Sequence, residues 1–135
     1  MWTFIQQTGY LLDAAGQLFY QGYSGNGDGK NNPAMQAVAN IGPLPCGSYI
    51  IGEPEDSPRT GPYTLPLISD PANEMFGRSL FRIHGDNIAA PGTASDGCIV
   101  VNQPYRTQIW ESGDHQLSVV ASLAFQILVD PELGT

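Results

Sequence analysis

Two side chains suited to nucleophilic catalysis lie close together in the stretch FRIHGDNIAAPGTASDGCIV, which runs from Phe81 to Val100. His84 precedes Cys98 by fourteen residues, and the whole chain contains two histidines and two cysteines. A thiol with the usual pKa of about 8.5 is mostly protonated near neutral pH, so a cysteine nucleophile needs a base or a lowered pKa. An imidazole within reach of Cys98 would hold a thiolate–imidazolium pair and then protonate a leaving amine. The alternative is a buried structural thiol beside an unrelated histidine.

The residues around this pair favour the catalytic interpretation. If Leu80–His84 is a strand, its alternation places Arg82 and His84 on one face and turns the residues between them toward the core. The strand stops at a glycine, and a polar pair at a strand end is a natural place for a functional site. Gly97 lets the backbone turn sharply next to Cys98. The N–H groups of Gly97 and Cys98 are then expected to stabilise an oxyanion.

The elements that must position these residues are mostly strands. Eleven prolines and sixteen glycines spread along the chain favour many short elements joined by turns. We expect a single domain over residues 1–135, mainly β, forming a sandwich or barrel with one or two short helices. Alternation and composition predict strands at Trp2–Gln6, Tyr10–Asp13, Gln17–Gly22, Ser48–Glu53, Tyr63–Ile68, Leu80–His84, Ile99–Val101, Gln116–Val120 and Ala124–Asp130.

Turns and helices are also expected at defined places. The segment Asp13–Gly16 has the composition of a hairpin turn, and Gly25–Pro33 that of a long polar loop. A short helix is expected after it, capped by Asn32, starting at Pro33 and ending before Gly42, and another over Pro104–Ser112. The proline-rich and acid-rich stretch Glu53–Asn73 is interpreted as loops around one strand, which either frame a cleft or form an ordinary connection.

Composition excludes several classes of function. The net charge of −8 would repel phosphate backbones and anionic lipid, so we expect no nucleic-acid partner. No apolar stretch is long enough to span a bilayer, and MWTFIQQTGY does not resemble a signal peptide, so neither membrane insertion nor general secretory export is expected. The spacing of the histidines and cysteines matches no zinc site, and no cofactor is expected.

The chain resembles a known family in three blocks. HGD followed by SDGCIV is similar to the signature of the L,D-transpeptidase fold. GYSGNGDGKNNPAMQAVANIGPLPCGSYIIG (residues 22–52), FGRSLFRIHGD (76–86) and ASDGCIV (94–100) resemble the L,D-transpeptidase-like effectors that bacteria deliver by type VI secretion. The resemblance implies a mostly β fold and a peptidoglycan substrate. It also implies attack on the carbonyl of the third stem residue, release of D-alanine, and a thioester that is resolved by hydrolysis, exchange or cross-linking.

The resemblance assigns roles to particular residues. It makes Cys98 the nucleophile, His84 the general base and acid, and Gly85 the backbone partner that orients the imidazole. Ser95 and Gly97 match the hydroxyl residue and the glycine of the signature. The general signature has histidine where this chain has Asp96 and arginine where it has Val100, which weakens the expectation of cross-linking.

Five residues are candidates for binding substrate. A released D-amino acid carries a carboxylate that a guanidinium can bind in bidentate fashion, and Arg82 and Arg78 are the candidates, with an exposed salt-bridging role as the alternative. Asp86 either caps a turn or touches substrate, and Tyr23 beside the glycine-rich loop is a candidate for lining the cleft. Asp96 lies next to the nucleophile, where a carboxylate favours an imidazolium and opposes a thiolate.

Other interpretations remain open at this level. Cys46 has a structural role or forms a disulfide with Cys98, and His115 is either a surface residue or the base in place of His84. A papain-like peptidase of the NlpC kind is a second enzyme class, although those domains place cysteine before histidine. A third interpretation is a binding module without activity.

The resemblance further implies a place and partners for the protein. Such an effector is made in the cytoplasm, handed to a component of the type VI apparatus, and acts in the periplasm of the target bacterium on the stem peptides of peptidoglycan. A cognate immunity protein is an expected partner, and the acidic chain would attract a basic face on it.

Overall fold

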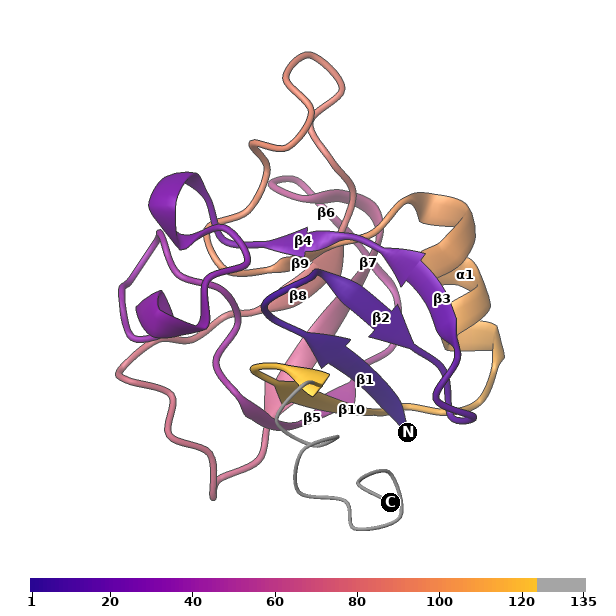
Figure 1. Ribbon diagram of the computed structural model, residues 1–135. Coiled ribbons are helices and arrows are strands. Elements are labelled where there is room, and N and C mark those ends of the chain that lie inside the picture. The colour runs from indigo at the N-terminus through magenta and orange to yellow at the C-terminus, as the bar shows by residue number, and fades with distance from the viewer. Residues whose placement is uncertain (124–135) are drawn as a thin grey trace, which may run out of the picture.

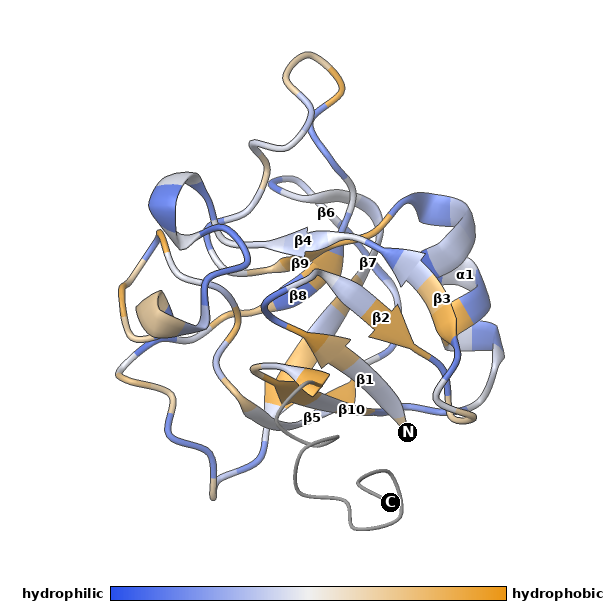
Figure 2. Ribbon diagram, in the orientation of Figure 1, coloured by the Kyte–Doolittle hydropathy of each residue, from blue (hydrophilic) through white to orange (hydrophobic). Residues whose placement is uncertain are grey.

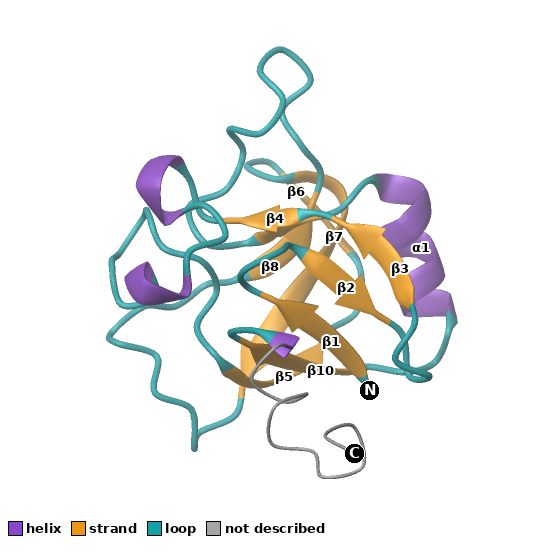
Figure 3. Ribbon diagram, in the orientation of Figure 1, coloured by secondary structure: helices purple, strands orange, loops and turns teal. Residues whose placement is uncertain are grey.

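The computed structural model describes residues 1–123, and in it ten short strands form one curved sheet with a single α-helix beside it (Figures 1 and 3). This confirms the mainly β class with a short helix. The strands are β1 (Trp2–Ile5), β2 (Tyr10–Leu12), β3 (Leu18–Gln21), β4 (Tyr23–Ser24), β5 (Gly47–Ile51), β6 (Glu55–Ser57), β7 (Gly61–Ser69), β8 (Arg82–His84), β9 (Ile99–Val100) and β10 (Gln116–Val120). The helices are two 3-10 turns, η1 (Gly27–Gly29) and η2 (Pro33–Met35), and α1 (Gln103–Glu111).

The order of the strands makes the sheet curve back on itself. The path runs β3-β2-β1-β10-β5-β7-β8-β9-β4, and β6 pairs with β7 as a side branch. Its two ends, β3 and β4, are separated in the chain by Gly22 alone. A Cβ atom at Gly22 would lie 2.1 Å from the carbonyl oxygen of Val100, so only glycine lets the chain pass this closely over β9. The strands therefore wrap around a common interior.

Apolar side chains from most of the strands fill that interior. Figure 2 shows hydrophobic residues concentrated on the strands, whereas most of the loops are hydrophilic. Along β1 and β10 the alternation expected of strands brings Phe4 and Val119 together as register partners, and both are buried. The helix α1 packs against β7 and β8 and buries Ile109. No helix within residues 1–123 has the length and apolar character needed to cross a membrane.

The predicted strands were found at close to the expected positions. The hairpin turn Asp13–Gly16 joins β2 to β3, with the Asp13 carboxylate accepting from the N–H groups of Ala15 and Gln17. The expected strand Ala124–Asp130 lies outside the described residues. Two strands were not predicted: β4 is two residues long, and β6 is acidic and lies in the stretch that was assigned to loops.

The predicted helix after Asn32 begins as expected but is much shorter. The Asn32 side chain accepts from the N–H of Ala34, and Pro33 is the first helical residue, yet only the 3-10 turn η2 forms. Within the expected helix the carbonyl of Gln36 accepts a hydrogen bond from a buried arginine, Arg78, which also donates to the carbonyls of Gly42 and Pro43 beyond its expected end. This tertiary contact overrides the local helix propensity. The helix expected over Pro104–Ser112 is present as α1.

Candidate active site

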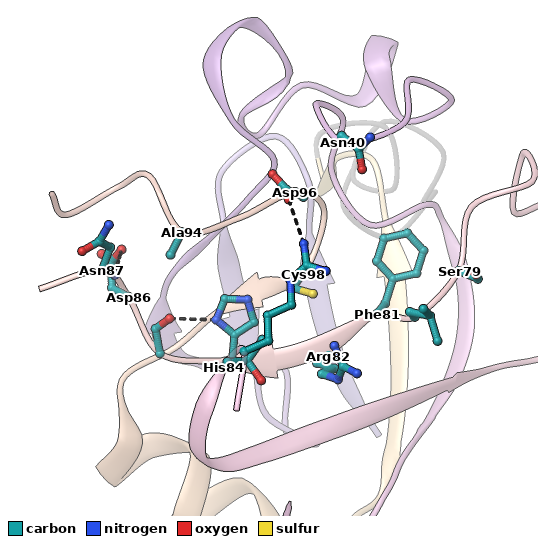
Figure 4. A pocket seen from close by; sticks show the side chains of 14 residues that line it. Asn40, Ser79, Phe81, Arg82, His84, Asp86, Asn87, Ala94, Asp96 and Cys98 are labelled. Atoms are coloured by element: carbon teal, nitrogen blue, oxygen red, sulfur yellow. Dashed lines mark hydrogen bonds and ion pairs between the residues drawn. The ribbon is translucent and has the colours of Figure 1, made fainter. Parts of the chain in front are cut away.

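His84 and Cys98 are brought together by two neighbouring parallel strands. β8 and β9 pair with Ile83 opposite Ile99, and both isoleucines are fully buried. Strand alternation therefore turns Arg82 and His84 to the opposite face, as predicted. Cys98 immediately precedes β9, and the same register continued by one residue places it beside Arg82. Both His84 and Cys98 line a pocket of about 580 Å3 (Figure 4).

The wall of this pocket comes from three parts of the chain. The turn of the β6–β7 hairpin, β8 with the segment that leads into it, and the loop between β8 and β9 supply all but one of its lining residues. These are Arg59 and Thr60, then residues 79–82 and 84–87, then Ala94, Asp96 and Cys98, with Asn40 from the loop after η2. A pocket of this size is typical of sites that bind small molecules or the end of a peptide.

The imidazole of His84 is held in one orientation by its neighbour. Its Nδ1 lies 2.8 Å from the carbonyl oxygen of Gly85. A carbonyl can only accept, so Nδ1 carries the proton and Nε2 keeps a free lone pair. Burial lowers the pKa of His84, and the charges of Arg106 and Arg82 lower it further, against the opposing effects of the Gly85 hydrogen bond and Asp86. The ring is therefore neutral at pH 7 and able to accept a proton.

The thiol of Cys98 is also neutral before substrate binds. Burial raises its pKa, and the negative charge of Asp96 adds to this. A hydrogen bond from the backbone N–H of Arg82 and the positive charges of Arg82 and Arg59 act in the opposite direction without overcoming it. Since the pKa of His84 is lowered and that of Cys98 is raised, the resting site favours a neutral thiol beside a neutral imidazole rather than the expected thiolate–imidazolium pair.

The turn that leads into Cys98 is fixed by a buried serine. The Ser95 hydroxyl donates to the carbonyl of Cys98 at 2.6 Å and accepts from the N–H groups of Gly97 at 3.0 Å and Gly25 at 2.8 Å. The N–H of Gly97 is thus already engaged, which corrects the expectation that it binds an oxyanion. Gly97 adopts φ +132, and a Cβ there would lie 2.5 Å from Nη2 of Arg78. Ser95 and Gly97 therefore shape the loop that presents the sulfur.

Arg78 has a structural position instead of a place on the pocket wall. It is buried, and its guanidinium lies 5.2 Å from the centre of the Phe81 ring. The same guanidinium donates to four backbone carbonyls, those of Gln36, Gly42, Pro43 and Asp96. With its donors directed at these carbonyls, it ties the loop after η2 to the loop that carries Cys98. This overturns the expectation that Arg78 binds substrate.

Tyr23 and Asp86 contact one another and hold the loop between β8 and β9. The Tyr23 hydroxyl donates to Asp86 Oδ1 at 2.6 Å and accepts from the N–H of Ala94 at 2.9 Å. Asp86 also accepts from the N–H groups of Asn87 and Gly92. Burial acts to raise the pKa of Asp86, but these hydrogen bonds outweigh it and the pKa is lowered. Asp86 lines the pocket, whereas Tyr23, which was expected to line it, is not one of its lining residues.

Two ion pairs connect the β6–β7 hairpin to the rest of the pocket. Nε of Arg82 lies 4.0 Å from Glu55 on β6, and Nη2 of Arg59 in the hairpin turn lies 3.8 Å from Oδ2 of Asp96. In Figure 4 the dashed line from Asp96 marks this second pair. Arg82 and Asp96 both line the pocket, and their binding of substrate stays a prediction. Arg59 was not predicted as a site residue.

The second cysteine and the second histidine lie elsewhere. Cys46 and Cys98 are both free thiols, so the disulfide that the sequence left open is absent within residues 1–123. The Cys46 sulfur lies 3.4 Å from Oε1 of Gln6. His115 stacks on Trp110 with ring centres 3.9 Å apart and does not line the pocket, so it is not placed to replace His84. No cluster of potential metal ligands occurs among the described residues.

Sequence reasoning missed one more arginine that supports the site. Arg106 on α1 is buried and donates to the carbonyls of Pro62, Tyr63 and Val101. It lies against Gly85, where an added Cβ would be 3.2 Å from its Nη1. The chain contains only five lysines and arginines, so each of them is a candidate for a role in the site. That scarcity was the one signal in the sequence that pointed to Arg59 and Arg106.

Comparison with protein-family models matches residues 19–123 to the Tlde1 domain. Searches of curated proteins and of solved structures found no match. The matched region runs from β3 through β10 and contains every residue that lines the pocket. The chain therefore belongs to the Tlde1 family, a family of type VI secretion effectors related to L,D-transpeptidases.

Proposed function

We propose that this effector is a cysteine-dependent L,D-carboxypeptidase and L,D-transpeptidase that acts on the tetrapeptide stems of peptidoglycan. One observation carries the proposal: His84 and Cys98 line the same pocket, and Gly85 holds the imidazole with its Nε2 free to accept a proton. Membership of an effector family related to L,D-transpeptidases supports the choice of substrate.

The first half of the reaction forms an acyl-enzyme. The Cys98 sulfur attacks the carbonyl carbon of the third stem residue, and Nε2 of His84 takes the thiol proton as the C–S bond forms. The intermediate then collapses, the C–N bond to the terminal D-alanine breaks, and the imidazolium gives the same proton to the leaving nitrogen. D-Alanine departs as a free amino acid and a thioester remains on Cys98.

The backbone around Cys98 is proposed to stabilise the intermediate. Of the two N–H groups expected to bind the oxyanion, that of Gly97 is directed at Ser95. The N–H of Cys98 itself is therefore the candidate that remains. Because the Cys98 thiol and the His84 imidazole are both neutral before substrate binds, the thiol loses its proton to the imidazole at the same time as the C–S bond forms.

The second half of the reaction releases the stem. A water molecule that gives a proton to His84 attacks the thioester carbonyl, the C–S bond breaks, the sulfur recovers the proton, and a tripeptide stem is released. When the amino group of another D-amino acid attacks instead of water, a new peptide bond forms and the terminal residue has been exchanged. We propose hydrolysis and exchange as the main reactions, because Asp96 and Val100 stand where the general L,D-transpeptidase signature has histidine and arginine.

Delivery by the type VI apparatus places these reactions in the periplasm of a target bacterium, where shortened or altered stems interfere with wall synthesis. A producing cell exposed to the same toxin from its neighbours needs a cognate immunity protein. The net charge of −8 suits a partner with a basic face.

The two other functions considered fit this geometry less well. In a papain-like peptidase the cysteine opens a helix, whereas Cys98 leads into strand β9. A binding module without activity gives no reason for an oriented imidazole and a thiol to share one pocket. Alkylation of Cys98 under native conditions separates the enzyme from the binding module, because an inaccessible thiol would resist the reagent until the protein is denatured.

The decisive experiment incubates the purified protein with tetrapeptide muropeptides, with and without an added D-amino acid, and follows the products by mass spectrometry. We expect tripeptides and exchanged tetrapeptides with the native protein and neither with Cys98→Ala or His84→Ala. The chain supplies matched controls, because Cys46→Ala and His115→Ala remove the same side chains away from the pocket and should retain activity. Intact tetrapeptides with the native protein, or equal turnover by Cys98→Ala, would contradict the proposal.

A further inference from the structure

The cations of this chain are few, and most of them are already engaged. All five lie among the described residues. Arg78 and Arg106 are buried against backbone carbonyls, and Lys30 sits 4.2 Å from the centre of the Tyr23 ring and donates to the carbonyl of Gly92. Only Arg59 and Arg82 line the pocket. The side chain of Arg59 is 82% exposed and that of Arg82 is 27% exposed, so Arg59 is the guanidinium most open to a ligand.

Arg59 lies in a turn that is held by side-chain hydrogen bonds. It lies between β6 and β7, where the Ser57 hydroxyl accepts from the N–H groups of Arg59 at 3.2 Å and Thr60 at 3.1 Å. The Thr60 hydroxyl is in turn 2.8 Å from that of Thr64 on β7. The backbone of the turn is therefore fixed, while the guanidinium at the end of the side chain remains free to move between partners.

The present partner of Arg59 is weakly held. Its ion pair with Asp96 spans 3.8 Å, and the Asp96 side chain is 62% exposed. Exposed pairs of this kind contribute little to stability because water and salt screen them. A second carboxylate that enters the pocket can take the place of Asp96 at small cost. A bidentate contact in a pocket closed by substrate would be stronger than the pair it replaces.

The position of this pair matches the position of a leaving group. Asp96 lies two residues before Cys98 in the chain, so a guanidinium that reaches Asp96 stands over the loop that carries the nucleophile. In a terminal amino acid the carboxylate is joined to the scissile nitrogen through a single carbon. When the scissile carbonyl is at the sulfur, that carboxylate must lie close by. The charge of Arg59 is felt at Cys98, where it acts to lower the pKa of the thiol.

We propose that Arg59 binds the C-terminal carboxylate of the substrate, and that Asp96 holds the Arg59 guanidinium in the empty pocket and releases it when substrate enters. This inference rests on the proposed function, and it names the feature of the substrate that the site selects. Stems that end in a free carboxylate are cleaved, whereas bonds inside a longer peptide offer no terminal carboxylate to Arg59. The residue thus makes the enzyme a carboxypeptidase rather than an endopeptidase.

The kinetic test compares a tetrapeptide stem with the same stem ending in a carboxamide. Arg59→Ala should raise KM for the free acid by roughly tenfold or more, the effect of losing a charged hydrogen bond, and should abolish the preference for acid over amide. Arg59→Lys keeps the charge and should restore part of the preference. Asp96→Asn should lower KM by roughly two- to fivefold, since the pair it removes is exposed. Asp28→Asn makes the same charge change outside the pocket and serves as the control.

A second measurement does not depend on turnover. In a Cys46→Ser background, the rate of alkylation of Cys98 by anionic iodoacetate is divided by the rate with neutral iodoacetamide. Arg59→Ala should lower this ratio and Asp96→Asn should raise it. If the native protein leaves tetrapeptides intact but the ratio follows Arg59, the proposed function is wrong and the anion site stands. If the native protein releases D-alanine while Arg59→Ala changes neither the acid preference nor the ratio, the role of Arg59 is refuted and the proposed function survives.

Discussion

Replacing Gly97 by alanine tests whether close packing behind Cys98 sets the position of the nucleophile. Gly97 adopts φ +132, where a Cβ atom is strained by about 1–2 kcal/mol. The new Cβ would also lie 2.5 Å from Nη2 of Arg78 and 2.7 Å from Cε1 of Phe81. A flexible arginine could move away, but this guanidinium is held by four backbone carbonyls. Overpacking of this kind costs about 1–3 kcal/mol more, so we expect a total loss of about 2–5 kcal/mol.

The matched control is Gly16→Ala. Gly16 adopts φ +78 in the β2–β3 turn, and an added Cβ there meets nothing within 4 Å. It should therefore lose only the backbone contribution, about 1–2 kcal/mol. Urea denaturation measures both variants, and the release of D-alanine is followed for each at a temperature where it remains folded. We expect Gly97→Ala to be the less stable of the two and to lose activity beyond its loss of folded protein. Equal denaturation midpoints and equal rates would refute the reasoning.

Three further predictions concern the same site. Burial lowers the pKa of His84 and raises that of Cys98, so kcat/KM should stay high over a wider pH range than the usual pKa values of the two side chains would give. Activity should fall at a pH below the usual histidine pKa, where the base becomes protonated, and at a pH above the usual cysteine pKa, where no proton remains for the leaving amine. A pH profile bounded by the two ordinary pKa values would contradict this. Tyr23→Phe removes the hydroxyl that bridges Asp86 and a backbone N–H, and should cost about 1–3 kcal/mol in urea denaturation, with an unchanged midpoint counting against the bridge. Arg78→Met leaves four carbonyls without their donor and should lower the free energy of unfolding by about 3 kcal/mol or more, whereas Arg78→Lys should recover part of this loss. A methionine variant as stable as the native protein would show that these carbonyls find other partners.

Much of the fold followed from local patterns in the sequence. Alternation located β1, β2, β5 and β10 to within two residues at each end, because each has one face against the interior. The faces of β8 were also predictable, since Ile83 is apolar and the residues on either side of it are charged or titratable. That pattern alone was enough to direct His84 away from the core and toward the same side as Arg82.

The errors arose where distant residues decide local structure. The helix expected after Pro33 is cut short where Arg78, more than forty residues later, takes the carbonyl of Gln36 together with those of Gly42 and Pro43 beyond the expected end of the helix. Arg78 itself was assigned to substrate because nothing in its neighbourhood in the sequence shows those carbonyls. Arg59 was missed because it lies in a hairpin turn far from Cys98 in the chain. The pairing of β7 with β8 brings that turn to the pocket.

The parallel pairing of β1 with β10 has a consequence for the synthesis of this protein. Trp2 lies opposite Leu117, and β10 is also the strand that connects β1 to β5. The middle of the sheet therefore cannot close until residue 120 has left the ribosome. Sheets built from such distant pairings fold slowly. During that delay the apolar residues of β1 and β5 stay exposed, which gives chaperones an interval in which to bind the nascent chain before the sheet has closed.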